Sequence, residues 1–303
     1  MGKGTTALGI VLKIALVGVV VACTCLLVPK LLEYKESDDA YKRLKDEVIE
    51  PEDPTEPSKE NASESVLDEE TESETEEEEV FKVDWEKLKG TDVVAWLQID
   101  EISYPVMHSD NNQKYLHALP DGTYNYGGSI FLYSKNKPLF EDKASFLYGH
   151  NMANGSMFGK LKRYTDKKYA NHRFYVYLPD GTRRVYEFFG VLSTHEGSGF
   201  YVWSFGTDEE FMNWQKSVKN ASFYKTGGEP SLDGKYVLLS TCNGPAGTSQ
   251  RLLVIGKYME SEEIQEPASW YDEYRDRILD EEIAEETMSE IMDEFETEPV
   301  EWQ

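Results

Sequence analysis

The sequence predicts a mostly β protein, built as a barrel or a closed sandwich, with one N-terminal helix that can span a membrane. Two observations predict the β domain. Eight short runs rich in β-branched and aromatic residues follow one another between positions 93 and 259, and turn signals separate several of them. Few helical stretches interrupt these runs. Many short strands with few helices favour a closed all-β architecture.

The predicted strands are 93–99, 102–107, 128–133, 144–149, 173–178, 184–194, 235–242 and 251–259. Clear turn signals are Pro179-Asp180-Gly181 and Asp233-Gly234, where the residue types favour tight turns. Two flanking helices are predicted, at 156–164 and 208–220. No internal repeat is present in the sequence.

The N-terminal helix is predicted from a 22-residue apolar run, 7–28, which only Lys13 interrupts. This length matches the hydrocarbon core of a bilayer. Two rival interpretations are a cleaved signal peptide and a lipoprotein whose processing site precedes Cys23. The run continues past Cys23 as far as Val28, which favours an uncleaved anchor. Lysines lie on both sides of the run, so the positive-inside rule hardly specifies the orientation.

The acidic charge is confined to two segments. The formal net charge is −26, but residues 50–79 contribute −14 and residues 260–303 contribute −16, so the rest is nearly neutral. We predict an anchor over 1–30, a short helix and an acidic disordered spacer over 31–79, a catalytic domain over 80–259, and an acidic, partly helical tail over 260–303. The nearly neutral domain argues against nucleic-acid binding.

The cysteine pattern points to one candidate nucleophile. Cys23 and Cys25 lie in the apolar run, so Cys242 is the only cysteine of the remaining chain. Cys242 ends one predicted strand, and Arg251 opens the next after only eight residues, a gap that favours an antiparallel hairpin. A guanidinium beside a sulfur favours the reactive thiolate. The alternative is a cysteine buried in the core beside an arginine that merely reaches the surface.

A catalytic cysteine usually works with a histidine. Of the five histidines, His150 directly follows the strand at 144–149, a place where scaffolds present functional groups. The other four lie among ordinary polar residues and are interpreted as surface histidines: His108, His117, His172 and His195.

Three segments together resemble the class B sortases. These are the segment 147–164 around His150, LLSTCN at 238–243, and SQRLLVIGKY at 249–258. Segments at 102–107, 110–116 and 128–133 resemble the same class. The resemblance covers roughly residues 84–259, and its combination of motifs is specific although each motif alone is weak. It implies an eight-stranded β-barrel with flanking helices, an N-terminal anchor and an extracellular location on a Gram-positive bacterium.

The resemblance also implies roles for individual residues. Cys242, His150 and Arg251 fall on the catalytic positions of the family's motifs. Four further residues fall on positions associated with substrate binding: Asn112, Leu116, Ser240 and Thr241. Asn243 departs from the pattern, because related enzymes often carry an acidic residue there. The departure leaves open whether a carboxylate orients His150.

The implied reaction is transpeptidation. Cys242 attacks a Thr–Gly-type bond in a sorting motif and forms a thioacyl enzyme. The implied partners are secreted proteins with such a motif, the membrane, and an amine from a cell-wall precursor or a pilin. No cofactor and no metal are expected, since the histidines lack ligand spacing. Two alternatives stay open, a cysteine hydrolase of cell-wall peptides and a non-catalytic surface β-domain.

Overall fold

The computed structural model describes residues 7–51, 80–244 and 248–296. The spacer predicted over 50–79 therefore lies outside the described residues from 52 onward. Eight strands form one closed barrel in the order β10-β8-β7-β3-β4-β5-β6-β9. Their bounds are β3 (Val93–Ile99), β4 (Ile102–Met107), β5 (Ile130–Leu132), β6 (Ala144–Tyr148), β7 (Arg173–Tyr177), β8 (Thr182–His195), β9 (Tyr236–Cys242) and β10 (Gln250–Glu263). Each predicted strand corresponds to one strand of this barrel.

Most barrel pairs are antiparallel, but β4 with β5 and β6 with β9 are parallel. The interior is filled by apolar side chains from facing strands, which leave almost no exposed surface; examples are Leu97, Val106, Leu147, Val176, Leu239 and Val254. Burial of this kind supplies most of the stability of a small barrel, at about 1.5–3 kcal/mol per large apolar side chain. The barrel is thus a packed core whose ends carry the functional loops.

The second flanking helix forms as predicted, and the first does not. Helix α2 (Asp208–Ala221) begins at Thr207, whose side chain accepts a hydrogen bond from the Glu210 amide. The stretch 156–164 instead contains only the start of the 3₁₀ helix η2 (Leu161–Thr165), and a second 3₁₀ helix, η3 (Lys167–Tyr169), follows it. Met157 has a φ of 50° and Gly155 a φ of 83°, which an α-helix does not allow. A third 3₁₀ helix, η1 (Trp85–Leu88), precedes the barrel.

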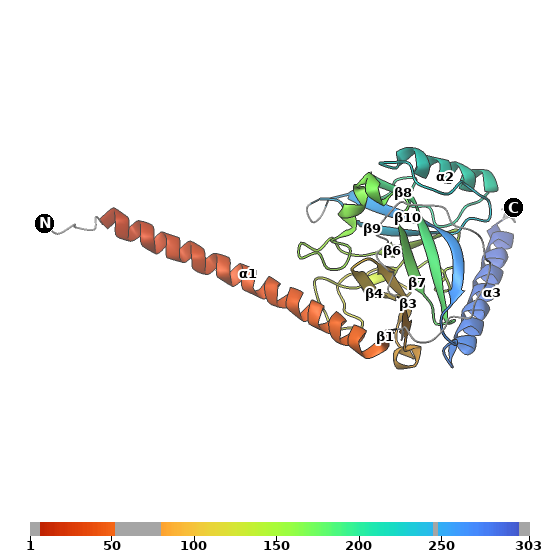
Figure 1. Ribbon diagram of the computed structural model, residues 1–303, viewed down its shortest axis with the longest axis horizontal. Coiled ribbons are helices and arrows are strands. Elements are labelled where there is room, and N and C mark those ends of the chain that lie inside the picture. Colours follow the sequence, from red (N-terminus) through yellow and green to blue (C-terminus); the bar gives the residue numbers. More distant parts are fainter. Residues whose placement is uncertain (1–6, 52–79, 245–247, 297–303) are drawn as a thin grey trace, which may run out of the picture.

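The N-terminal helix is longer than predicted. Helix α1 (Ala7–Val48) runs without a break from the apolar run through residues 31–48, and β1 (Ile49–Pro51) then pairs with β2 (Phe81–Val83). Its described apolar half is exposed and is long enough to cross a membrane. Figure 1 shows this half projecting away from the barrel, while the C-terminal half lies beside it. The two halves therefore have different surroundings.

The C-terminal half of α1 packs on the barrel. Tyr41 and Val48 are buried in two core clusters, and the Asp84 amide donates to the Val48 carbonyl at 2.7 Å. At the other end of the domain, β10 continues to Glu263 and is followed by α3 (Tyr271–Glu296). Trp270 before α3 donates from Nε1 to the Trp85 carbonyl. The packing therefore extends beyond residues 80–259 at both ends.

These contacts change what we expect from truncation. A protein of residues 31–303 should unfold at a clearly higher temperature than one of residues 80–303, because the shorter protein loses Tyr41, Val48 and β1. Each buried apolar side chain contributes about 1.5–3 kcal/mol, enough to shift a melting temperature by several degrees. Thermal unfolding followed by circular dichroism measures the difference. Equal melting temperatures would show that residues 31–79 add nothing to the stability of the domain.

Candidate active site

Cys242 and Arg251 lie side by side at one end of the barrel. Cys242 is the last residue of β9, and Arg251 of β10 is its direct partner in the antiparallel register. The thiol-bearing residue is half-buried. The hairpin predicted from the eight-residue spacing is therefore present, although residues 245–247 of its loop lie outside the described chain.

The parallel pairing of β6 with β9 brings His150 to the same end. Tyr148 of β6 pairs with Ser240 of β9, so His150 and Cys242 each lie two residues beyond a paired position. Hydrogen bonds continue past the strands: the Thr241 hydroxyl donates to the Gly149 carbonyl at 2.7 Å, and the side-chain amide of Asn151 donates to the Cys242 carbonyl at 2.9 Å. Parallel neighbours end at the same edge of a sheet, which explains the convergence.

The ring of His150 is fixed on three sides. Nε2 lies 2.8 Å from the Leu116 carbonyl oxygen, and because a carbonyl only accepts, Nε2 carries the hydrogen. In the neutral ring, Nδ1 is then the free acceptor. The rings of His117 and Tyr126 stack on His150 at centroid distances of 5.4 and 5.8 Å. These contacts set the orientation of the imidazole.

The surroundings of His150 favour its neutral form. Burial is the main cause that lowers the pKa of His150 below its usual value; the Leu116 carbonyl opposes this shift and nearby His117 adds to it. An imidazole that is neutral near pH 7 can accept a proton, and its protonated form is a strong acid that readily gives the proton up. Both properties suit a general acid–base group.

The loop that carries Leu116, whose carbonyl contacts His150, is itself held by α1. The Ser129 hydroxyl donates to the Ala118 carbonyl, and the Tyr41 hydroxyl lies 2.7 Å from the Gly128 carbonyl and 2.8 Å from the Ser129 hydroxyl. A side chain at Gly128 would meet the Leu116 carbonyl oxygen at 2.3 Å, and its φ of 55° also favours glycine. The position of Leu116 thus depends on residues far from it in sequence.

The Arg251 guanidinium is engaged on the side away from β9. It donates to the Thr248 carbonyl at 2.5 Å and to the Gln250 carbonyl at 3.0 Å, and it forms an ion pair with Glu196. Glu196 follows β8 and is largely exposed. Glu196 could not be predicted from the sequence, because an isolated glutamate in a loop gives no signal.

Asn243, which stands where related enzymes often carry an acid, donates to the Ser193 hydroxyl at 2.8 Å. It therefore links β9 to β8 across the end of β10. The carboxylate that the structure places beside a candidate catalytic group is that of Glu196, and it contacts Arg251.

The four candidate substrate-binding residues differ in position. Leu116 contacts His150 directly through its carbonyl. Ser240 and Thr241 flank Cys242 but are buried, and their hydroxyls bond to Tyr201 and to the Gly149 carbonyl. Asn112 accepts a hydrogen bond from the Ser134 amide at 2.8 Å. A role of these residues in binding substrate stays a prediction.

An aromatic cluster adjoins the site. Tyr148 and Tyr201 stack with nearly parallel rings at a centroid distance of 6.5 Å, and Trp203 lies 6.3 Å from Tyr133. Burial is the largest cause that raises the pKa of Tyr201, so its hydroxyl stays protonated beside Ser240. A signal for this cluster exists in the sequence, since residues 200–205 read FYVWSF with four aromatics in six positions.

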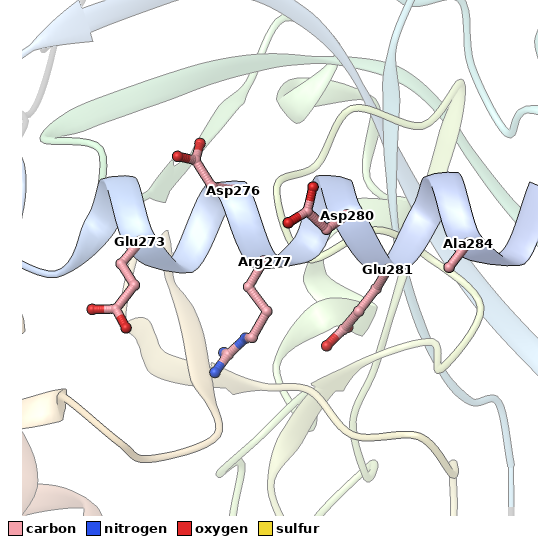
Figure 2. Close-up of a pocket in the computed structure, with 6 residues that line it drawn as sticks. All are labelled: Glu273, Asp276, Arg277, Asp280, Glu281 and Ala284. Carbon is pink, nitrogen blue, oxygen red and sulfur yellow. The ribbon is translucent and has the colours of Figure 1, made fainter.

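A shallow hollow along α3 is separate from this site. Figure 2 shows six side chains of this one helix around it: Glu273, Asp276, Arg277, Asp280, Glu281 and Ala284. Four acidic residues, one arginine and one alanine on a single helix provide neither a thiol nor an imidazole. The hollow therefore does not compete with the Cys242 site as a catalytic centre.

Known proteins share this combination of fold and motifs. The family model described as the sortase domain matches residues 97–259, which is more than half of the chain. A curated relative, sortase B from Listeria monocytogenes serovar 1/2a, is 33% identical over 178 residues, which cover 57% of this chain and 72% of the relative. The chain is a class B sortase.

Solved structures agree with this assignment. The structure of sortase B from Listeria monocytogenes matches with a TM-score of 0.51 at 32% identity and covers 57% of this chain and 97% of that one. The structure of sortase B from B. anthracis covers 76% of this chain and 99% of its own, with a TM-score of 0.58; at 23% identity it supports the fold alone. The predicted eight-stranded barrel is confirmed, and this class B sortase is a cysteine transpeptidase.

Proposed function

We propose that Cys242 is the nucleophile of this sortase, with His150 and Arg251 as its catalytic partners. One observation carries the proposal: the direct register between Cys242 and Arg251, at the barrel end where the β6–β9 pairing also presents His150. A thiol, an imidazole and a guanidinium at one edge are the groups that acyl transfer through a thioester requires.

In the first half of the reaction, the Cys242 thiolate attacks the carbonyl carbon of a Thr–Gly-type bond. A carbon–sulfur bond forms, the carbon–nitrogen bond breaks, and the His150 imidazolium gives a proton to the departing amine. The acyl part of the substrate stays on Cys242 as a thioester.

In the second half, a primary amine attacks the thioester carbonyl. Neutral His150 takes a proton from this amine, a new amide forms, and the thiolate of Cys242 is released. The amine belongs to a cell-wall precursor or to a pilin lysine. Secreted proteins with a C-terminal sorting motif are the acyl donors, and the domain lies outside the cell on an uncleaved single-pass anchor.

Arg251 stabilises the negative charge that develops on the substrate carbonyl oxygen. In the structure its guanidinium binds Glu196 and two backbone carbonyls, those of Thr248 and Gln250. When the substrate oxygen replaces the exposed Glu196 carboxylate as the partner of Arg251, the N–H donors of the planar guanidinium point toward the reacting carbonyl.

The experiment is a transfer assay with the full-length protein in detergent. A library of peptides with Thr–Gly bonds is incubated with oligoglycine, with a lysine peptide, or without an amine, and the products are identified by mass spectrometry. We expect an amide product that appears only with the protein and an amine. Hydrolysis at equal rates with and without amine would support the cysteine hydrolase instead, and no cleavage of any peptide would support a non-catalytic domain.

A further inference from the structure

The part of α1 that contacts the barrel begins close to the predicted membrane span. The apolar run ends at Val28, and the carbonyl of Glu33 already accepts a hydrogen bond from the Asn125 side chain at 3.1 Å. At about 1.5 Å per residue, five helical residues correspond to roughly 7 Å along the axis. The helix continues through both positions, with Pro29, which cannot donate a backbone hydrogen bond, inside it.

Several contacts fix the direction of the helix relative to the barrel. Asn154 donates to Asp38 at 3.2 Å, and the Tyr41 hydroxyl bonds to Gly128 and Ser129. Ser37 is buried at the same interface. Because α1 is continuous, these contacts also fix how the barrel is oriented toward the membrane that holds the apolar half.

The loop beside His150 contacts α1 close to the end of the span. Asn125 contacts Glu33, and the next residue, Tyr126, stacks on His150 at 5.8 Å. The polar headgroup layer adds about 5–7 Å outside the hydrocarbon core. A residue roughly 7 Å beyond the end of the span therefore lies at the outer limit of the headgroups, and tilting of α1 would bring it closer.

The side chains at this position suit an interface. Tyr124 is 69% exposed and Tyr126 is 40% exposed, on either side of buried Asn125. Tyrosine combines an apolar ring with a polar hydroxyl and is enriched where membrane meets water. Both rings also contact His117, at centroid distances of 6.1 and 5.8 Å, so their exposed parts belong to one aromatic surface beside His150.

We propose that the loop around Tyr124 and Tyr126 rests on the surface of the membrane that holds α1, so that the His150 side of the active site opens toward the lipid headgroups. The partner of this surface is the bilayer itself. The proposal rests on the membrane anchor that forms part of the proposed function. This orientation brings the active site within reach of acyl donors and amine acceptors that are held at the same membrane.

The test uses full-length protein in phosphatidylcholine vesicles with and without lipids that carry a nitroxide on the headgroup. Tyr124→Trp introduces a fluorophore at the loop, and Met259→Trp is the control, since Met259 is 45% exposed and lies on β10 eight positions from Arg251. The emission of each introduced tryptophan is obtained by subtracting the emission of the unsubstituted protein from that of the variant. We expect the nitroxide to remove about half of this emission for Tyr124→Trp and little for Met259→Trp.

Two other outcomes would overturn the proposal in different ways. If the protein floats with the vesicles but quenching is equal at both positions, the loop does not lie on the membrane, and the anchor is unaffected. If the protein does not float with the vesicles, the anchor is wrong and this proposal fails with it. The transfer assay in detergent would stand in either case.

Discussion

Cys242→Ala abolishes peptide cleavage and thioacyl formation in the full-length protein, with a loss of at least about 10⁴-fold in rate. The reason is that Cys242 is the only cysteine of the sequence outside the apolar run, so no other thiol can form the thioester. The substitution removes one sulfur from a half-buried position, so the domain stays folded. Product formation and the mass of the acyl-enzyme measure the effect.

The matched control is the double variant Cys23→Ala, Cys25→Ala. Both cysteines lie in the exposed apolar half of α1, and their loss should leave the rate within about twofold of the unsubstituted protein. Together the two variants separate the candidate nucleophile from the remaining thiols. Cleavage that persists in Cys242→Ala would remove Cys242 as the nucleophile.

His150→Gln lowers the transfer rate by about 10³-fold, because an amide can neither give nor take a proton near neutral pH. The amide can still donate to the Leu116 carbonyl, which preserves the contact that positions the ring. His172→Gln is the control, since His172 pairs with Asp100 at the β3–β4 turn and should change the rate by no more than about twofold. Comparable losses in both variants would mean that histidine substitution acts on the fold rather than on the reaction.

The same variant changes the pH dependence of stability. The pKa of His150 is lowered in the folded state, mainly by burial, so between its folded pKa and its ordinary value of 6.5 the unfolded chain binds more protons. The free energy of unfolding therefore falls as the pH falls through this window, and stability is greatest above it. His150→Gln should weaken this dependence. Partly buried His108, whose pKa is also lowered mainly by desolvation, should keep part of it, and urea titrations at pH 5 and pH 7.5 measure both.

The sequence by itself determined the β architecture, because alternation and turn chemistry are local properties. The bounds of β3 and β4 match the predicted runs, and Thr207 begins α2 as a capping residue should. The spacing between Cys242 and Arg251 predicted their hairpin, since a short connection allows only antiparallel pairing. The motifs around Cys242 and His150 likewise identified the family before any comparison.

Local signals failed where distant residues decide. Nothing near 156–164 predicts that Met157 adopts a positive φ; its amide donates to the hydroxyl of Tyr104, which lies 53 positions away. The ion pair of Glu196 with Arg251 joins residues 55 positions apart, so no local pattern indicates it. Similarly, the charge pattern of residues 31–48 suggested only a short helix, whereas burial of Tyr41 and Val48 makes this segment part of the folded domain.

The sequence determined which groups perform the chemistry, and the tertiary structure decided how they are held. A thiol, an imidazole and a guanidinium are chemical identities that the chain carries in any conformation. The contacts that orient His150 exist only in the folded protein, because they come from separate segments. They are the Leu116 carbonyl, the rings of His117 and Tyr126, and the hydroxyl of Tyr41 that holds the neighbouring loop. Contacts between distant segments depend on the closed barrel and on the path of α1, and no local preference specifies either.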